Sequence, residues 1–237
     1  MTDDVSLSAL WHEVTGTQPD PEQWLIGATA AVALLAVLTG TPWRLLRNAV
    51  TIAHEGGHAL VALLTGRQLT AIRLHSDTSG LTVSRGKPHG PGMVLTAAAG
   101  YTAPSLLGLA GAWLLASNHI TALLWGAVLL LAAMLIMIRN AYGVLSVVLT
   151  GAAFFLVSWF AGPDVQAAFA YWSVWFLLIG GVRPVQELQR KRARGRAPSS
   201  DADQLARLTH APATLWVFLF YAVSLGALAG GATLLVD

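Results

Sequence analysis

His54, Glu55 and His58 are the residues of this sequence whose types and spacing could do chemistry together. They lie in the apolar stretch of residues 50–64. Two histidines four residues apart fall on one face of an α-helix, where both imidazoles can bind a single metal ion. In the His-Glu-x-x-His spacing, the glutamate next to the first ligand takes a proton from a zinc-activated water. The stretch therefore predicts a hydrolytic metal centre on a helix.

The surroundings of this motif favour a functional role. Two imidazoles and a carboxylate inside an apolar segment are unfavourable unless something compensates them. The alternative is a pair of satisfied polar residues in a helix bundle, without a metal. Gly56 and Gly57 between the histidines each cost about 1 kcal/mol in a helix relative to alanine. They indicate close approach by another helix or by a substrate backbone, and ordinary packing of small residues explains them equally well.

Composition places the chain in a membrane. Of its 237 residues, 55% are hydrophobic and only 11% are charged, whereas soluble domains carry about 25% charged residues. Such a chain has too few polar residues to cover a surface that faces water. It has no cysteine, so a metal site must use nitrogen and oxygen ligands, which favours two histidines and a carboxylate.

Apolar segments long enough to be helices recur along the whole chain, and we expect an all-α polytopic membrane protein with about seven transmembrane helices. The first segment is short for a span and ends at Thr39-Gly40-Thr41-Pro42, a stop signal for one helix and a start signal for the next. The second carries the metal motif, about 16 Å of helix beyond Arg44, and so inside the membrane past its middle. The seven expected segments are residues 24–38, 43–65, 93–116, 120–138, 144–160, 167–182 and 214–236.

Polar segments divide the rest of the chain. Residues 1–23 contain five acidic residues and no Lys or Arg, which argues against a secretory signal; we interpret them as an acidic lead-in to one integral membrane domain, residues 24–237. Residues 67–91 show strand patterning on both sides of a turn, which predicts a small β-hairpin after the motif helix. An exposed strand edge there could bind an extended substrate by main-chain hydrogen bonds. A plain connector is the alternative.

Positive charge predicts the orientation. Residues 183–200 form a basic segment that we expect to be a loop, and with seven spans it shares one side with the N-terminus and the hairpin. By the positive-inside rule that side is cytoplasmic, in a multi-pass protein of the cell's inner (plasma) membrane. Of the fourteen Lys and Arg residues, only Arg44 and Arg47 oppose this assignment. A topology-setting loop in contact with the lipid bilayer is preferred over a nucleic-acid site, and no nucleic-acid partner is expected.

A third ligand is needed, because catalytic zinc usually has three protein ligands and one open position. Asp201 and Asp203 lie on the side toward which His58 is displaced, at the start of a helix, where capping worth about 1 kcal/mol explains them without a metal. Loop histidines such as His75 and His89 are usually solvated and are not expected to be ligands. The residues alone leave the choice open. The acidic candidates are Asp77, Asp164, Glu187, Asp201 and Asp203.

The chain resembles the site-2 protease class of intramembrane zinc metallopeptidases, and more closely a compact bacterial branch, the M50B-like peptidases. The likeness covers most of residues 45–220 and rests on the His54–His58 motif, the hairpin after it and a later aspartate near the cytoplasmic face. Only the His-Glu-x-x-His part is specific. The shorter similar stretches are Gly100-Tyr101, Arg139-Asn140-Ala-Tyr-Gly143 and Ser200-Asp201-Ala202 followed by Leu205 and Thr209.

This resemblance implies a role for particular residues. His54 and His58 would be ligands of one Zn²⁺ ion, Glu55 the general base, and Asp201 the third ligand in preference to Asp203. The Leu-Asp-Gly signature that supplies the carboxylate in typical site-2 proteases is absent from this sequence. Asn140, at the cytoplasmic end of a span, is a further candidate for holding substrate backbone.

These observations lead to a first functional hypothesis, a zinc-dependent intramembrane endopeptidase. Its substrates would be transmembrane or membrane-proximal segments of membrane proteins, cleaved by metal-activated water. The alternative is a non-catalytic membrane scaffold or transport-type protein with a structural metal or a buried polar cluster. A catalytically silent relative that binds membrane partners is a third possibility, which the complete His-Glu-His set disfavours.

Overall fold

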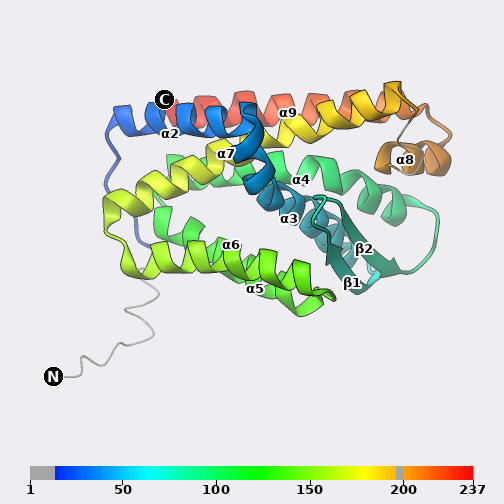
Figure 1. Cartoon of the computed structure of the whole chain (residues 1–237), viewed down its shortest axis with the longest axis horizontal. Helices are drawn as coiled ribbons and strands as arrows, with labels where there is room; N and C mark the ends of the chain where they lie inside the picture. The colour runs from blue at the N-terminus through cyan, green and yellow to red at the C-terminus, as the bar shows by residue number, and fades with distance from the viewer. Residues whose placement is uncertain (1–13, 196–199, 237) are drawn as a thin grey trace.

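Long apolar helices make up most of the structure, a computed structural model that describes residues 14–195 and 200–236 (Figure 1). A two-stranded antiparallel sheet, β1 (Gln68–Leu74) and β2 (Gly80–Arg85), follows the helix that carries the motif. This arrangement confirms a polytopic helical protein with a small hairpin. The helices are α2 (Gln23–Leu38), α3 (Gly40–Leu64), α4 (Pro91–Ala116), α5 (Ile120–Met137), α6 (Ala141–Phe160), α7 (Pro163–Ala193), α8 (Asp201–Thr209) and α9 (Ala213–Val236).

The number of spans differs from the seven expected. Among the described residues, five helices are long and apolar enough to cross a membrane, namely α4, α5, α6, α7 and α9. Helices α2 and α3 form a pair bent by 101°, which makes at most a sixth span. At 1.5 Å per residue, the 16 residues of α2 rise only about 24 Å, less than the roughly 30 Å of hydrocarbon. By length and composition, the first two apolar segments therefore make at most one crossing, either a broken span or a re-entrant pair.

The described part of the acidic lead-in lies at the end of the molecule opposite the hairpin. The main-chain N–H of Gln18 donates to the carbonyl of Asn118 at 2.9 Å, and the side chain of Gln18 accepts from the N–H of Ile120 at 2.8 Å. Residues 14–22 thus sit beside the α4–α5 turn, while the sheet lies at the far end (Figure 1). The described lead-in thus lies at the other end of the molecule from the hairpin, whereas our prediction places both on one side of the membrane. Residues 1–13 lie outside the described part of the chain.

The basic segment is mostly helix and not loop. Helix α7 continues through Pro184 to Ala193, a length of 31 residues or about 46 Å, so it extends well beyond the hydrocarbon. Cations in its last turn are favourable at the negative end of the helix dipole. Residues 196–199 of the predicted loop lie outside the described residues. Arg47 pairs with Glu187 of α7 at 2.9 Å, so it lies in the hairpin half of the molecule. It is therefore on the same side as the other Lys and Arg residues and does not oppose the predicted orientation.

Helix α4 crosses the centre of the bundle and packs against α3 through small residues. A Cβ added at Gly57 would lie 2.3 Å from the Cβ of Ala103, so only glycine permits this approach. The close approach predicted from sequence is thus confirmed for Gly57, and the neighbour is a helix. At Gly56 the nearest atom is the sulfur of Met134 at 4.0 Å, which leaves that position uncrowded.

One edge of the hairpin is closed by the α5–α6 turn. The side-chain amide of Asn140 accepts from the N–H of Leu74 at 3.2 Å and donates to its carbonyl at 2.6 Å. Beside it, the N–H of Arg139 donates to the carbonyl of Ile72 at 2.9 Å. In the structure, Asn140 therefore binds the main chain of β1. The outer edge of β2 has no main-chain partner within residues 14–195 and 200–236.

Candidate active site

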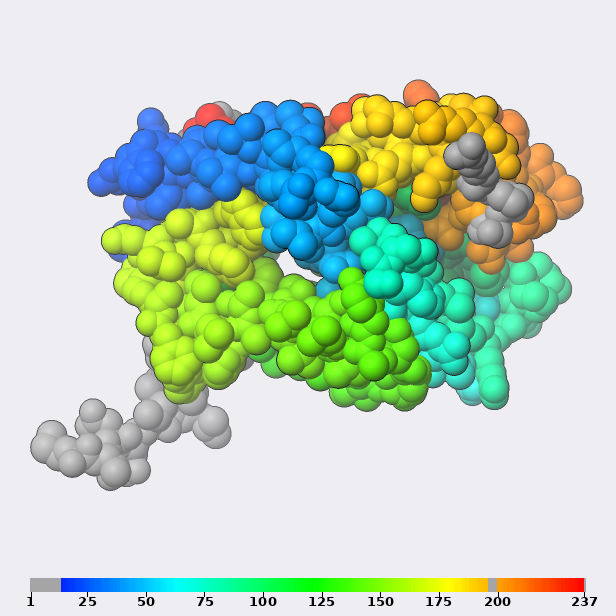
Figure 2. All heavy atoms as spheres, in the orientation of Figure 1, coloured from blue at the N-terminus to red at the C-terminus, as the bar shows by residue number. Residues whose placement is uncertain are grey.

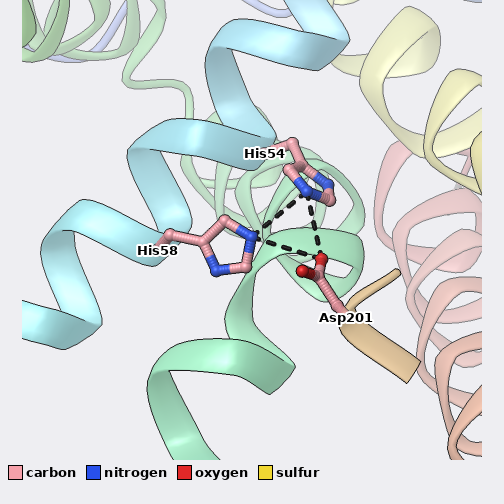
Figure 3. A group of neighbouring side chains, drawn as sticks. All are labelled: His54, His58 and Asp201. Carbon is pink, nitrogen blue, oxygen red and sulfur yellow. Dashed lines mark hydrogen bonds and ion pairs between the residues drawn. The ribbon is translucent and has the colours of Figure 1, made fainter. Parts of the chain in front are cut away.

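His54 and His58 of α3 converge with Asp201 of α8, as Figure 3 shows. The Nε2 atoms of the two imidazoles lie 3.2 Å apart, and each lies 3.3 Å from Oδ2 of Asp201. Within the described residues these three side chains form the group of His and carboxylate ligands that could hold a metal ion. The helical spacing brings the histidines together, and the fold adds an aspartate more than 140 residues away.

The geometry of the three atoms fits a small tetrahedral ion. With bonds of about 2.0 Å, two ligands of tetrahedral zinc stand about 3.3 Å apart. The three measured separations, 3.2, 3.3 and 3.3 Å, match that edge. Two imidazole nitrogens and a carboxylate oxygen are also a donor set used by catalytic zinc. His54, His58 and Asp201 therefore fit a metal ion and leave a fourth position open.

Backbone groups of α4 orient the imidazoles. Nδ1 of His58 lies 2.7 Å from the carbonyl of Thr96, an arrangement that places the proton on Nδ1 and leaves Nε2 as the ligand atom. A Cβ on Gly100 would lie 2.3 Å from Nε2 of His58 and 2.6 Å from Nε2 of His54. The ring of Tyr101 packs edge-on against His54, and it stacks on Phe220 of α9. Helix α4 thus forms one wall of the site.

The two candidate aspartates of α8 point toward different partners. Ser200 caps this helix, because its hydroxyl oxygen accepts from the N–H of Asp203 at 3.4 Å, and its O–H donates to the Asp203 carboxylate at 2.6 Å. Asp203 also pairs with Arg192 of α7. Asp203 is thus the capping partner, and Asp201 faces the histidines. Buried Ala202 and Leu205 fix this rotation of the helix.

The two carboxylates have different partners. Oδ2 of Asp201 lies 3.3 Å from Nε2 of both His54 and His58 and is the oxygen that would bind the ion. For Asp203, burial would raise the pKa, but the hydrogen bonds from Arg192 and Ser200 outweigh it and hold that pKa below its usual range. Asp203 is therefore an anion at neutral pH, as an ion-pair partner must be.

A family model described as Peptidase M50B-like matches residues 27–231. The chain belongs to this family. M50B-like peptidases are part of the site-2 protease class, so the site just described lies in a metallopeptidase family, and the apolar helices make this M50B-like peptidase a multi-pass membrane protein. No curated protein and no solved structure matches the chain.

Glu55 of the M50B-like peptidase points toward the hairpin. Its carboxylate Oε2 accepts a hydrogen bond from the hydroxyl of Thr82 at 2.6 Å, and the residue is 3% exposed. Glu55 lines a cleft of about 250 Å³ together with His54 and Asp201. The sequence pattern predicts a base next to the ligands. It contains no signal for Thr82, because the partner lies across a hairpin whose register depends on the fold.

Glu187 is engaged in a separate cluster on the cleft wall. It pairs with Arg47 at 2.9 Å and with Arg183 at 3.4 Å, and it accepts from the indole N–H of Trp43 at 3.2 Å. The Arg183 guanidinium lies over the Trp43 ring, 4.7 Å from its centroid. This cluster joins the α2–α3 bend to α7, which explains an acidic residue at that position without a metal.

The remaining candidates lie away from the cluster. Asp77 is in the hairpin turn, where hydrogen bonds from Ser79 hold its pKa below the usual value. Asp164 is in the first turn of α7, at the opposite end of the molecule. His75 and His89 are exposed. Asn140 does not line the cleft, because β1 occupies its amide.

Proposed function

We propose that this chain is a zinc-dependent intramembrane endopeptidase that cleaves transmembrane or membrane-proximal segments of membrane proteins. The observation that carries the proposal is the His54, His58 and Asp201 cluster, whose ligand atoms lie within 4.8 Å of one another. Structural zinc sites are closed by four protein ligands, whereas catalytic sites keep one position open. Three candidate ligands, of which His54 and Asp201 line a cleft, support the catalytic type over the scaffold alternative.

The chemistry follows from the roles of the side chains. Zinc, when bound, would polarise the scissile carbonyl and acidify the attacking water. The Glu55 carboxylate accepts a proton from that water and can pass it to the leaving amine. His54, His58 and Asp201 hold the ion, and the Thr96 carbonyl fixes the ring of His58. The buried surroundings strengthen each of these electrostatic interactions.

The depth of the site supports cleavage within the membrane. Gly100, which touches both histidines, lies sixteen residues before the end of α4 at Ala116, or about 24 Å along the helix. Because the hydrocarbon is about 30 Å thick, this depth is near the hairpin side of the bilayer. The Lys and Arg residues concentrate on the hairpin half, so we propose that this half faces the cytoplasm.

Two features support an extended membrane substrate. The outer edge of β2 is free of main-chain partners among the described residues, and its first residue, Gly80, lines the cleft. Such an edge can bind an extended segment by strand addition. Figure 2 shows a hollow between α3, the helix that carries two of the ligands, and the α5–α6 pair.

The test compares two variants of the purified protein in lipid vesicles. Glu55→Gln is expected to keep zinc and to lose cleavage of a panel of synthetic transmembrane peptides, followed by mass spectrometry. His54→Ala is expected to lose both zinc and cleavage. A scaffold with a structural metal predicts instead a metal-loaded wild type without proteolysis. Undiminished cleavage by Glu55→Gln contradicts the proposal.

A further inference from the structure

The hairpin contacts the residue between the metal ligands. The hydroxyl of Thr82 on β2 lies 2.6 Å from Oε2 of Glu55 and 3.2 Å from the main-chain oxygen of Glu55. A threonine hydroxyl has one hydrogen to donate, and the shorter contact assigns it to the carboxylate. A strand more than 20 residues downstream of the motif thus holds one oxygen of the acid.

We propose that Thr82 is a positioning residue for the general base Glu55, so that β2 is part of the catalytic machinery and more than a connector. The inference rests on the proposed function, because it assigns the orientation of the base in that reaction. It does not require Thr82 to touch the substrate or the metal.

The two oxygens of Glu55 have different surroundings. Oε2 is held by Thr82, whereas Oε1 has no hydrogen-bond donor within residues 14–195 and 200–236. Oε1 lies against Gly80, where an added Cβ would approach it to 2.3 Å and the carboxyl carbon to 2.5 Å. Oε1 is therefore the oxygen left to accept a proton. Gly80 leaves it the space and Thr82 fixes its direction.

Independent contacts hold the hairpin in place on α3. Thr51 lies one helical turn before Glu55, and its hydroxyl donates to the carbonyl of Thr78 in the hairpin turn at 3.1 Å. On β1, Ile72 is 1% exposed and packs in one cluster with Ile52 and Ala59 of α3. The position of Thr82 is therefore fixed by the packing of the whole hairpin, and loss of its hydroxyl need not unfold the strand.

The experiment measures kcat, KM and bound zinc for wild type, Thr82→Val and Thr82→Ser, with the transmembrane peptides used above. Thr82→Val keeps the shape and removes the hydroxyl. Because a hydrogen bond to a charged group contributes about 1.5–3 kcal/mol, we expect kcat to fall about 10- to 100-fold. KM and zinc content should stay unchanged, and Thr82→Ser should restore most of kcat.

Ser84→Ala is the matched control. Ser84 lies on the same strand two residues further on, and its hydroxyl accepts a hydrogen bond from Arg67 at 3.0 Å. Loss of the Ser84 hydroxyl should weaken the hairpin about as much as Thr82→Val does, but it removes no contact with Glu55. The kcat of Ser84→Ala should therefore stay near the wild-type value.

The outcomes separate this inference from the proposed function. If Glu55→Gln is inactive and Thr82→Val retains wild-type kcat, the inference alone is overturned. The same holds if Thr82→Val loses zinc or if Thr82→Ser fails to restore kcat, because Thr82 would then serve folding. Cleavage that does not depend on Glu55 overturns both.

Discussion

Asp201 and Asp203 share a residue type and a helix, yet their surroundings give them different roles. Sequence reasoning places both at the start of a helix near His58 and cannot choose between them, since capping suits either one. The structure turns Asp201 toward the histidines and Asp203 toward Arg192 and Ser200. The choice depends on how α8 packs against α4 and α9, which a local pattern does not contain.

Substitution of each aspartate by asparagine should separate the two roles. Asp201→Asn should weaken zinc binding by more than about 100-fold, because even changes outside the ligand shell cost about 10- to 100-fold. Asp203→Asn should bind zinc like the wild type and lose only part of the α8 cap. Zinc affinity measured by competition with a chromophoric chelator checks both. Equal losses would mean that the aspartates share the metal.

Gly100 offers a second prediction at the scale of one residue. Gly100→Ala places a methyl group 2.3 Å from Nε2 of His58, so the imidazoles must move and zinc affinity should fall at least tenfold while the protein stays folded. Gly126→Ala is the control, because nothing lies within 4 Å of its added Cβ. Zinc titration and thermal unfolding of both variants are the measurements. Wild-type zinc affinity in Gly100→Ala would show that the rings have room.

Among the elements, apolar run length predicts the helices well and their ends poorly. The signal Thr39-Gly40-Thr41-Pro42 marks the break between α2 and α3, but it contains no information about the 101° bend between them. The polar residues after Arg183 suggest a loop, whereas α7 continues to Ala193. Beyond the membrane, the sides of a helix can be polar because water solvates them. The change from apolar to polar residues in α7 therefore marks where the helix leaves the membrane, and the helix itself ends later.

The hairpin gives a prediction for Asn140. Asn140→Ala removes two hydrogen bonds to Leu74, so β1 should lose about 1–3 kcal/mol of local stability. Hydrogen exchange of residues 68–74 should speed up accordingly, with KM for peptides affected only through the hairpin. Unchanged exchange together with a raised KM would instead support the role in substrate binding that the family resemblance implies.

For the whole molecule, the bent α2–α3 pair decides which segments lie at the same end. The described lead-in and the end of α9 lie at one end of the molecule, and the hairpin and the end of α7 lie toward the other (Figure 1). Seven separate spans would place the lead-in with the hairpin. The charge pattern predicts which half is cytoplasmic, but not the number of crossings, since a bent pair and two spans have the same composition.

The absence of cysteine from the chain makes this topology testable by labelling. Single cysteines at Thr17 and Val236 should react with a membrane-impermeant maleimide from one side of oriented vesicles, and cysteines at His89 and Ala193 from the other. All four positions are exposed. Labelling of Thr17→Cys from the same side as His89→Cys would instead support seven separate spans.

The long separation in sequence between His58 and Asp201 has a consequence for biogenesis. A nascent chain that includes α3 presents two imidazoles, but the carboxylate of Asp201 is synthesised only after α4 to α7. Until then the three candidate ligands are not all present. We therefore expect chains truncated before α8 to bind zinc more weakly than the full-length protein.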